Sequence, residues 1–148
     1  MEQMRIPPEL LSYFSPGDFE NYPIIKIPQT FTDNRGSIIN LADGVLGDVA
    51  LIQSKQNSIR ANHYHQEDWH LCYLIEGKFK YEWYRIGDTN VSATTILPGQ
   101  LIFTPKLVAH RLQFLEPSKF ITISKLSRIS EKYESDTIRL PDFNNSLN

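Results

Sequence analysis

Short segments that favour β-strands follow one another along most of the chain, and this regular succession constrains the fold most strongly. Turn-forming stretches such as TDNRG, DGVLGD and LPGQ separate them. Helical periodicity is almost absent from this part of the chain. About ten strands at a spacing of roughly 8–12 residues predict an antiparallel sandwich or barrel. The β-favouring runs are residues 23–28, 36–43, 48–55, 59–65, 70–77, 78–86, 91–97, 100–105, 110–115 and 120–126.

The chain of 148 residues has the length of one domain. We expect an N-terminal extension at 1–22, a single β-barrel domain at 23–128 and a polar C-terminal tail at 129–148. Hydrophobic residues make up 41% of the chain and charged residues 22%, which is enough apolar material for a core without disulfides. The single cysteine, Cys72, excludes an intramolecular disulfide.

Charge and hydropathy exclude several kinds of partner. The net charge of −2 gives no basic footprint for a nucleic-acid polymer. No stretch approaches the roughly 20 apolar residues of a membrane span, so no membrane partner is expected. The N-terminus lacks a basic region followed by a long apolar run, so we expect no secretory signal. These features predict a soluble cytoplasmic protein with a small-molecule partner.

The four histidines gather on predicted strands rather than on turns. Three of them, His63, His65 and His70, fall within eight residues, and the fourth is the distant His110. Side chains alternate between the two faces of a strand, so His63 and His65 share a face. His70 and His110 each lie in phase with apolar residues of their own runs. In a small barrel that face is the inside, so we expect the imidazoles to meet there.

Imidazole is a common ligand of divalent transition metals, and two imidazoles on alternate strand residues can chelate one ion. Fe, Ni, Zn, Mn and Cu all accept imidazole, so the pattern predicts a metal site without identifying the ion. A hydrogen-bonded polar cluster and a set of metal-free acid–base residues remain as alternatives. Four protein ligands on a tetrahedral ion leave no open position, whereas an octahedral ion keeps two positions free.

The segment from Asn57 to Gly77 resembles the first motif of the cupin family, G(X)5HXH(X)3–4E(X)6G. It reads His-Tyr-His from His63, then four residues, His70, six residues and Gly77. His70 stands at the position of the motif's glutamate, and Asn57 at that of its first glycine. Glu67 and Asp68 fall short of the glutamate position, and we expect both in a solvated turn.

A second segment resembles the other cupin motif, G(X)5PXG(X)2H(X)3N. It contains Gly99, Pro105 and His110 at the motif spacing, with Leu107 and Phe114 at the positions of its second glycine and its asparagine. The resemblance implies a double-stranded β-helix, a jelly-roll-like barrel, and commonly a homodimer. It also places metal ligands at four positions, namely His63, His65, His70 and His110.

The turn DNRG and the later IRANHYH resemble cupins that act on nucleotide-activated keto-sugars. These are the 4-keto-6-deoxysugar 3,4-ketoisomerases and the dTDP-4-dehydrorhamnose 3,5-epimerase relatives. Their resemblance implies that His63 or His65 is the base that removes a proton beside a ketone. It also implies that Arg60 contacts the phosphates of a sugar nucleotide and that a barrel tyrosine, best phased at Tyr81, is the acid. Arg35 of DNRG is either a further substrate contact or an exposed turn residue.

These implications conflict in one respect, because a histidine bound to a metal has no free lone pair to act as a base. If the metal is bound, it polarises the ketone, and Tyr81 or a metal-bound hydroxide moves the proton. The leading hypothesis is a metal-binding isomerase or epimerase of carbohydrate metabolism. The alternatives are a metal-dependent dioxygenase and a non-catalytic sensor or small-ligand-binding barrel.

Overall fold

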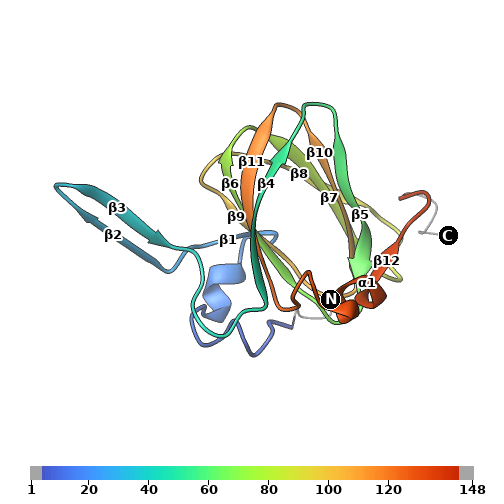
Figure 1. Cartoon of the computed structure of the whole chain (residues 1–148), viewed down its shortest axis with the longest axis horizontal. Coiled ribbons are helices and arrows are strands. Elements are labelled where there is room, and N and C mark those ends of the chain that lie inside the picture. Colours follow the sequence, from blue (N-terminus) through green and yellow to red (C-terminus); the bar gives the residue numbers. More distant parts are fainter. Residues whose placement is uncertain (1–4, 144–148) are drawn as a thin grey trace.

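Two five-stranded antiparallel sheets face each other and form the body of the molecule in the computed structural model, which describes residues 5–143 (Figure 1). Consecutive strands mostly alternate between the sheets, so neighbours within a sheet lie far apart in the sequence. This arrangement confirms the predicted all-β, double-stranded β-helix fold. The first sheet has the order β1 (Ile24–Ile25), β9 (Leu101–Thr104), β6 (His70–Glu76), β11 (Ser118–Ser124) and β4 (Asp48–Ser54).

The second sheet includes a strand from the predicted polar tail. The short helix α1 (Glu131–Asp136) leads directly into this strand, β12, which pairs with β5. Among residues 5–143, no helix has the length and apolar character needed to cross a membrane. The second sheet has the order β12 (Thr137–Arg139), β5 (Ile59–His65), β10 (Val108–Phe114), β7 (Phe79–Arg85) and β8 (Ser92–Ile96).

A separate hairpin extends away from both sheets (Figure 1). Its strands are β2 (Gln29–Asp33) and β3 (Gly36–Asn40), joined by the turn that the sequence TDNRG predicts. The β-favouring run at 36–43 therefore does form a strand, but this strand lies outside the two sheets of the barrel.

Aromatic side chains from both sheets fill the space between them. Phe79, Phe114 and Phe120 are all essentially buried, and their ring centroids lie 5.4–6.1 Å apart. Each contributes about 1.5–3 kcal/mol by burial. They fill the part of the interior that holds no histidine, and the remaining space forms the pocket described below.

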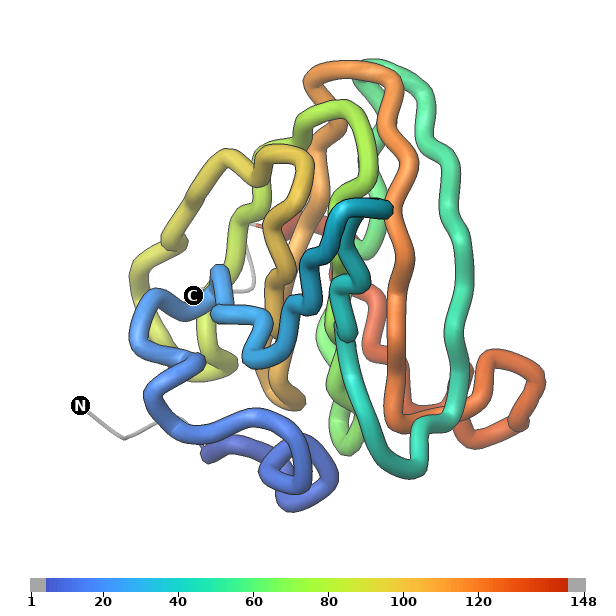
Figure 2. The backbone as a smooth tube through the Cα atoms, turned by 90° about the vertical axis from the view of Figure 1, so that its left-hand side faces the viewer, coloured from blue at the N-terminus to red at the C-terminus, as the bar shows by residue number. Residues whose placement is uncertain are grey.

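The predicted N-terminal extension covers the outer face of the first sheet. Leu10, Phe14 and Phe19, which lies in the single-turn helix η1 (Pro16–Phe19), pack with Leu71 and Phe103 in one buried cluster. Figure 2 shows this segment in blue, folded along one side of the barrel. The first sheet is thus apolar on both faces, which explains why its strands carry near-continuous hydrophobic runs.

Two residues that replace motif glycines adopt the backbone conformation that favours glycine. Asn57 has φ 67° and Leu107 has φ 60°, both in the left-handed region. Leu107 nevertheless donates its backbone N–H to the carbonyl of His65 at 2.7 Å. The turns of both cupin motifs are therefore kept although the glycines are not, which supports the alignment of the motifs.

Candidate metal centre and pocket

Strand pairing brings the two histidine-bearing segments together. β5 and β10 are antiparallel neighbours, and His63 lies directly opposite His110 in their register. The register shifts beside this pair, where Ala61 and Asn62 have positive φ values of 65° and 63°. This bulge re-aims the end of β5 and is typical of strands next to functional sites.

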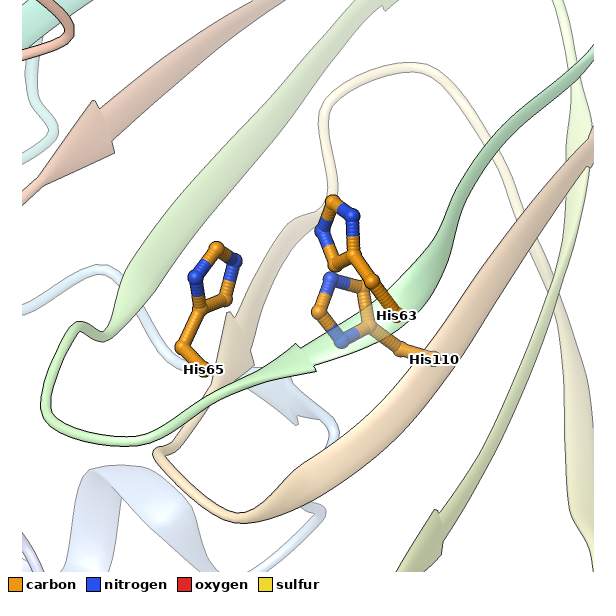
Figure 3. Close-up of side chains that lie close together, drawn as sticks. All are labelled: His63, His65 and His110. Carbon is orange, nitrogen blue, oxygen red and sulfur yellow. The ribbon is translucent and has the colours of Figure 1, made fainter. Parts of the chain in front are cut away.

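His63, His65 and His110 converge inside the barrel (Figure 3). One nitrogen from each ring lies within 4.8 Å of the others. The ring centroid of His63 lies 4.7 Å from that of His65 and 4.9 Å from that of His110. The structure therefore confirms that His63 and His65 share a face and that His110 meets them across the pair of strands.

Hydrogen bonds fix the tautomers of two of these imidazoles. The Nδ1 of His110 donates to the carbonyl of Val108 at 3.0 Å, which leaves Nε2 with its lone pair. The Nδ1 of His65 lies 3.5 Å from the carboxylate of Asp136 and 3.3 Å from the hydroxyl of Thr137. Because the Thr137 hydroxyl donates to a backbone carbonyl, it accepts from His65, and Nε2 of His65 also keeps its lone pair.

Two buried nitrogens of the cluster have no hydrogen-bond partner among the described residues. They are Nε2 of His65 and Nδ1 of His63. A buried polar atom without a partner costs about 1–3 kcal/mol, and a group bound at these nitrogens would offset that cost. Three imidazole nitrogens that face one another, with the free lone pairs of His65 and His110 fixed by hydrogen bonds, fit a divalent transition metal ion.

Burial keeps the three imidazoles neutral. Burial first, and the nearby His70 second, lower the pKa of His63 to about 4. Burial likewise lowers the pKa values of His65 and His110 below the usual value for histidine. Neutral imidazole is the form that binds metal, so at pH 7 no proton has to be displaced from any of the three rings.

His70 occupies a different position from the other histidines. Its ring stacks on His65 with centroids 4.5 Å apart, and its Nε2 lies 2.9 Å from the carboxylate of Asp68. His65, Asp68 and His70 form a second group of potential ligand atoms, adjacent to the three-histidine group. The resemblance-based assignment of His70 as a fourth ligand thus stays a prediction, whereas three imidazoles already converge without it.

The expected solvated turn at Glu67 and Asp68 is correct for one residue and wrong for the other. Glu67 is exposed, with 67% of its side chain accessible. Asp68 is fully buried, because its carboxylate accepts the backbone N–H groups of Lys125 and Leu126 as well as facing His70. Its buried charge is thereby stabilised by three hydrogen bonds.

A cavity of about 290 Å³ lies beside the histidines. Arg60 and Tyr81, both expected at the site from the sequence, line it. The Tyr81 hydroxyl is hydrogen-bonded to Thr104 at 2.7 Å, and burial raises its pKa well above the usual value, so the phenol stays protonated. Arg35 does not reach the cavity: it lies in the turn of the β2–β3 hairpin, 81% exposed and paired with Asp33.

The C-terminal tail supplies lining residues that the sequence did not indicate. β12 pairs with β5, opposite the His-Tyr-His segment itself, and α1 precedes it. A three-residue strand carries no detectable periodicity, and its partner lies about 70 residues away in the sequence. The lining residues from this tail are Tyr133, Glu134, Thr137 and Arg139, and Arg128 lies directly before it.

No family model matches the sequence, and no curated protein matches it either. Solved structures do match the fold. A sugar 3,4-ketoisomerase from Thermoanaerobacterium thermosaccharolyticum, in complex with TDP, superposes with a TM-score of 0.65 at 15% identity. That match covers 85% of this chain and 95% of the other. A variant of the same enzyme, in complex with TDP-4-keto-6-deoxyglucose, superposes with a TM-score of 0.64 at 16% identity, and the match covers 85% of this chain and 94% of the other.

Two further structures extend the comparison. A 3,4-ketoisomerase from Helicobacter canadensis has a TM-score of 0.64 at 20% identity, over 80% of this chain and 92% of its own. A dTDP-4-dehydrorhamnose 3,5-epimerase from Sulfolobus tokodaii has a TM-score of 0.60 at 16% identity, and the match covers 80% of each chain. The chain therefore has the cupin fold, in the form that these dTDP-sugar isomerases and epimerases share.

Proposed function

We propose that this protein is a metal-dependent isomerase or epimerase that shifts a proton beside the ketone of a nucleotide-activated keto-sugar. The observation that carries the proposal is the convergence of His63, His65 and His110, two of which present buried nitrogens without partners. Three protein ligands leave a coordination position open, as catalytic metal sites require. We further propose a divalent transition metal ion as the cofactor.

The fold and the cavity support a sugar nucleotide as substrate. Structures with this fold have been solved with TDP and with TDP-4-keto-6-deoxyglucose. Arg60 lines the cavity and bonds only to neutral groups, donating to the Ser54 hydroxyl at 2.6 Å and the Gln53 carbonyl at 2.9 Å. Its bonds within residues 5–143 leave its charge without a carboxylate partner, so the charge is available for a phosphate.

The bound ion would act as a Lewis acid that polarises the substrate ketone and stabilises the negative charge that develops on its oxygen. Since the three ligand histidines cannot also be bases, another group moves the proton. His70 suits this role because it lines the cavity and Asp68 holds its Nε2–H. Its Nδ1 is then the ring nitrogen that accepts a proton, and Asp68 stabilises the imidazolium that results.

Tyr81 suits the complementary role of proton donor. Its phenol stays protonated and its hydroxyl lies inside the cavity wall, where Thr104 orients it. A base and an acid placed at different points of one cavity permit proton removal at one atom and delivery at another, which is what isomerisation and epimerisation require.

Exchange of substrate hydrogen with solvent tests the proposal. The protein is incubated with dTDP-4-keto-6-deoxyglucose in D₂O, and deuterium at the carbons next to the ketone is followed by NMR. We expect exchange that stops when a chelator removes the metal. His70→Asn should lower the exchange rate about 10²–10⁴-fold and leave the metal content unchanged. His110→Gln should lose both the bound metal and the exchange activity. Exchange that persists without metal contradicts the metal-dependent mechanism.

A matched control distinguishes loss of chemistry from loss of structure. Gln113 lies on the same strand as His110 but outside the cavity lining. The variant Gln113→Asn should therefore retain full metal content and a normal exchange rate. Absence of exchange in the metal-replete protein, with this and other dTDP-4-keto-6-deoxyhexoses, contradicts the proposed reaction.

A further inference from the structure

Tyr133 and Arg128 line the cavity, and the reaction proposed above uses neither of them. Tyr133 belongs to α1, which lies beside the end of β5 (Figure 1). Arg128 lies in the connection between β11 and α1. The ring centroid of Tyr133 lies 6.2 Å from that of His65 and 6.3 Å from that of His70. Tyr133 is therefore on the side of the cavity that holds the proposed base.

The guanidinium of Arg128 is held by three hydrogen bonds. Its Nε donates to the carboxylate of Asp48 in β4 at 3.1 Å, and its Nη2 donates to the Thr122 hydroxyl in β11 at 2.9 Å. Its Nη1 donates to the Tyr133 hydroxyl at 3.2 Å. Arg128 therefore links the first sheet to the C-terminal segment. Because Asp48 already balances its charge, Arg128 differs from Arg60 and has no unpaired charge to offer a phosphate.

The hydroxyl of Tyr133 lies at the cavity wall. Phe120 and Thr122 share the inner face of β11 and both line the cavity, so the guanidinium bound to Thr122 is there as well. Tyr133 accepts one N–H of this guanidinium, and its own O–H proton therefore points elsewhere. Within the described part of the chain, no acceptor receives that proton. A hydroxyl donor placed in this way is suited to a bound ligand.

We propose that Tyr133 donates a hydrogen bond to the substrate hydroxyl on the carbon where His70 acts, and that Arg128 positions Tyr133 for this contact. The inference rests on the function proposed above. Because Tyr133 flanks His70, the oxygen that it reaches lies next to the carbon that loses its proton. Tyr133 thereby selects ketones that carry a hydroxyl group on the neighbouring carbon, since a substrate without that hydroxyl leaves the donor unpaired.

Ligand binding tests the contact separately from turnover. Metal-loaded protein with the His70→Asn substitution, which slows conversion, is titrated by calorimetry with dTDP-4-keto-6-deoxyglucose and with its 3-deoxy analogue. Adding Tyr133→Phe should weaken binding of the first sugar roughly 3–10-fold and leave binding of the analogue unchanged. Metal content and melting temperature should not change. The control Tyr73→Phe, on the strand of His70 but packed on the outer face of the first sheet, should bind both sugars normally.

A double-mutant cycle tests the positioning role of Arg128. Arg128→Gln should weaken binding of the hydroxylated sugar by a similar factor, but it should add little to Tyr133→Phe because both remove the same contact. Additive losses would overturn the role of Arg128.

The outcomes also separate this contact from the proposed reaction. Equal weakening of both sugars by Tyr133→Phe, or no weakening of either, would overturn the contact and leave the reaction standing. Weakening of the hydroxylated sugar alone, in a protein whose wild type shows no turnover, would support the contact and contradict the reaction. A wild type that binds neither sugar would overturn both.

Discussion

Lowering the pH should destabilise the metal-free protein through its buried histidines. His65 and His110 are only 1% and 4% exposed, and burial lowers both of their pKa values. In the unfolded chain the same groups have a pKa near 6.5, so unfolding takes up protons below that pH. The stability that these groups contribute is complete above about pH 6.5 and is lost progressively as the pH falls below it.

The magnitude follows from proton uptake. An imidazole that stays neutral in the folded state and has a pKa of 6.5 when unfolded shifts the folding equilibrium by roughly 25-fold between pH 7 and pH 5. Two such groups shift it by roughly 600-fold, or about 4 kcal/mol. His63, with a pKa of about 4, acts in the same direction. A loss of this size is a large part of the 5–15 kcal/mol typical of a domain.

Urea unfolding at pH 7, 6 and 5 in the presence of a chelator measures this effect, with tryptophan fluorescence as the signal. The comparison is with the variant His110→Gln, because the glutamine side chain at this position does not titrate. The variant should be less stable than the wild type at pH 7. Between pH 7 and pH 5, however, its folding equilibrium constant should fall by a factor roughly 25 times smaller than that of the wild type. Equal pH dependence in the two proteins would contradict this expectation, because it would mean that folding does not change the protonation of His110.

Three further substitutions probe the site. Arg60→Gln should raise the KM for a dTDP-keto-sugar roughly 10–100-fold with little change in kcat, measured by steady-state kinetics, since it removes a charged contact to phosphate. Tyr81→Phe should lower kcat about 10²–10⁴-fold without changing metal content, and retention of full kcat would exclude it as the proton donor. Asp136→Asn should weaken metal binding roughly 10–100-fold in a chelator competition, because Asp136 orients His65; unchanged affinity would remove that role.

The alternation of side chains along each strand predicted correctly that the histidines point into the barrel. The alternation of strand side chains placed His63 and His65 on one face and turned His110 inward, and the strand register then brought the rings together. The cupin-like spacing was informative even where its glycines are absent, because Asn57 and Leu107 keep the positive φ values that the turns require. The side-chain alternation and the motif spacing depend on neighbouring residues only, so they are visible in a single sequence, whereas the register that brings His63 opposite His110 is a long-range pairing.

Features that depend on long-range pairing were not predictable in the same way. Asp68 looks like a turn residue, and only the backbone of Lys125 and Leu126, more than 50 positions later, explains its burial. Asp136 and Thr137 lie in a segment that reads as a polar tail, and they reach His65 because β12 pairs with β5. The β2–β3 hairpin is followed by Leu41 and Leu46, which pack against the cluster on the outer face of the first sheet, and the strand pattern does not encode this contact.

Metal stoichiometry tests the central claim most directly. The protein is purified without chelator, loaded in turn with Fe(II), Zn(II), Mn(II), Ni(II) or Cu(II), desalted, and analysed by inductively coupled plasma mass spectrometry beside His63→Gln and His110→Gln. We expect close to one equivalent of at least one of these ions in the wild type and none in either variant. Less than about a tenth of an equivalent of every ion in the wild type, or equal binding by the variants, would contradict it.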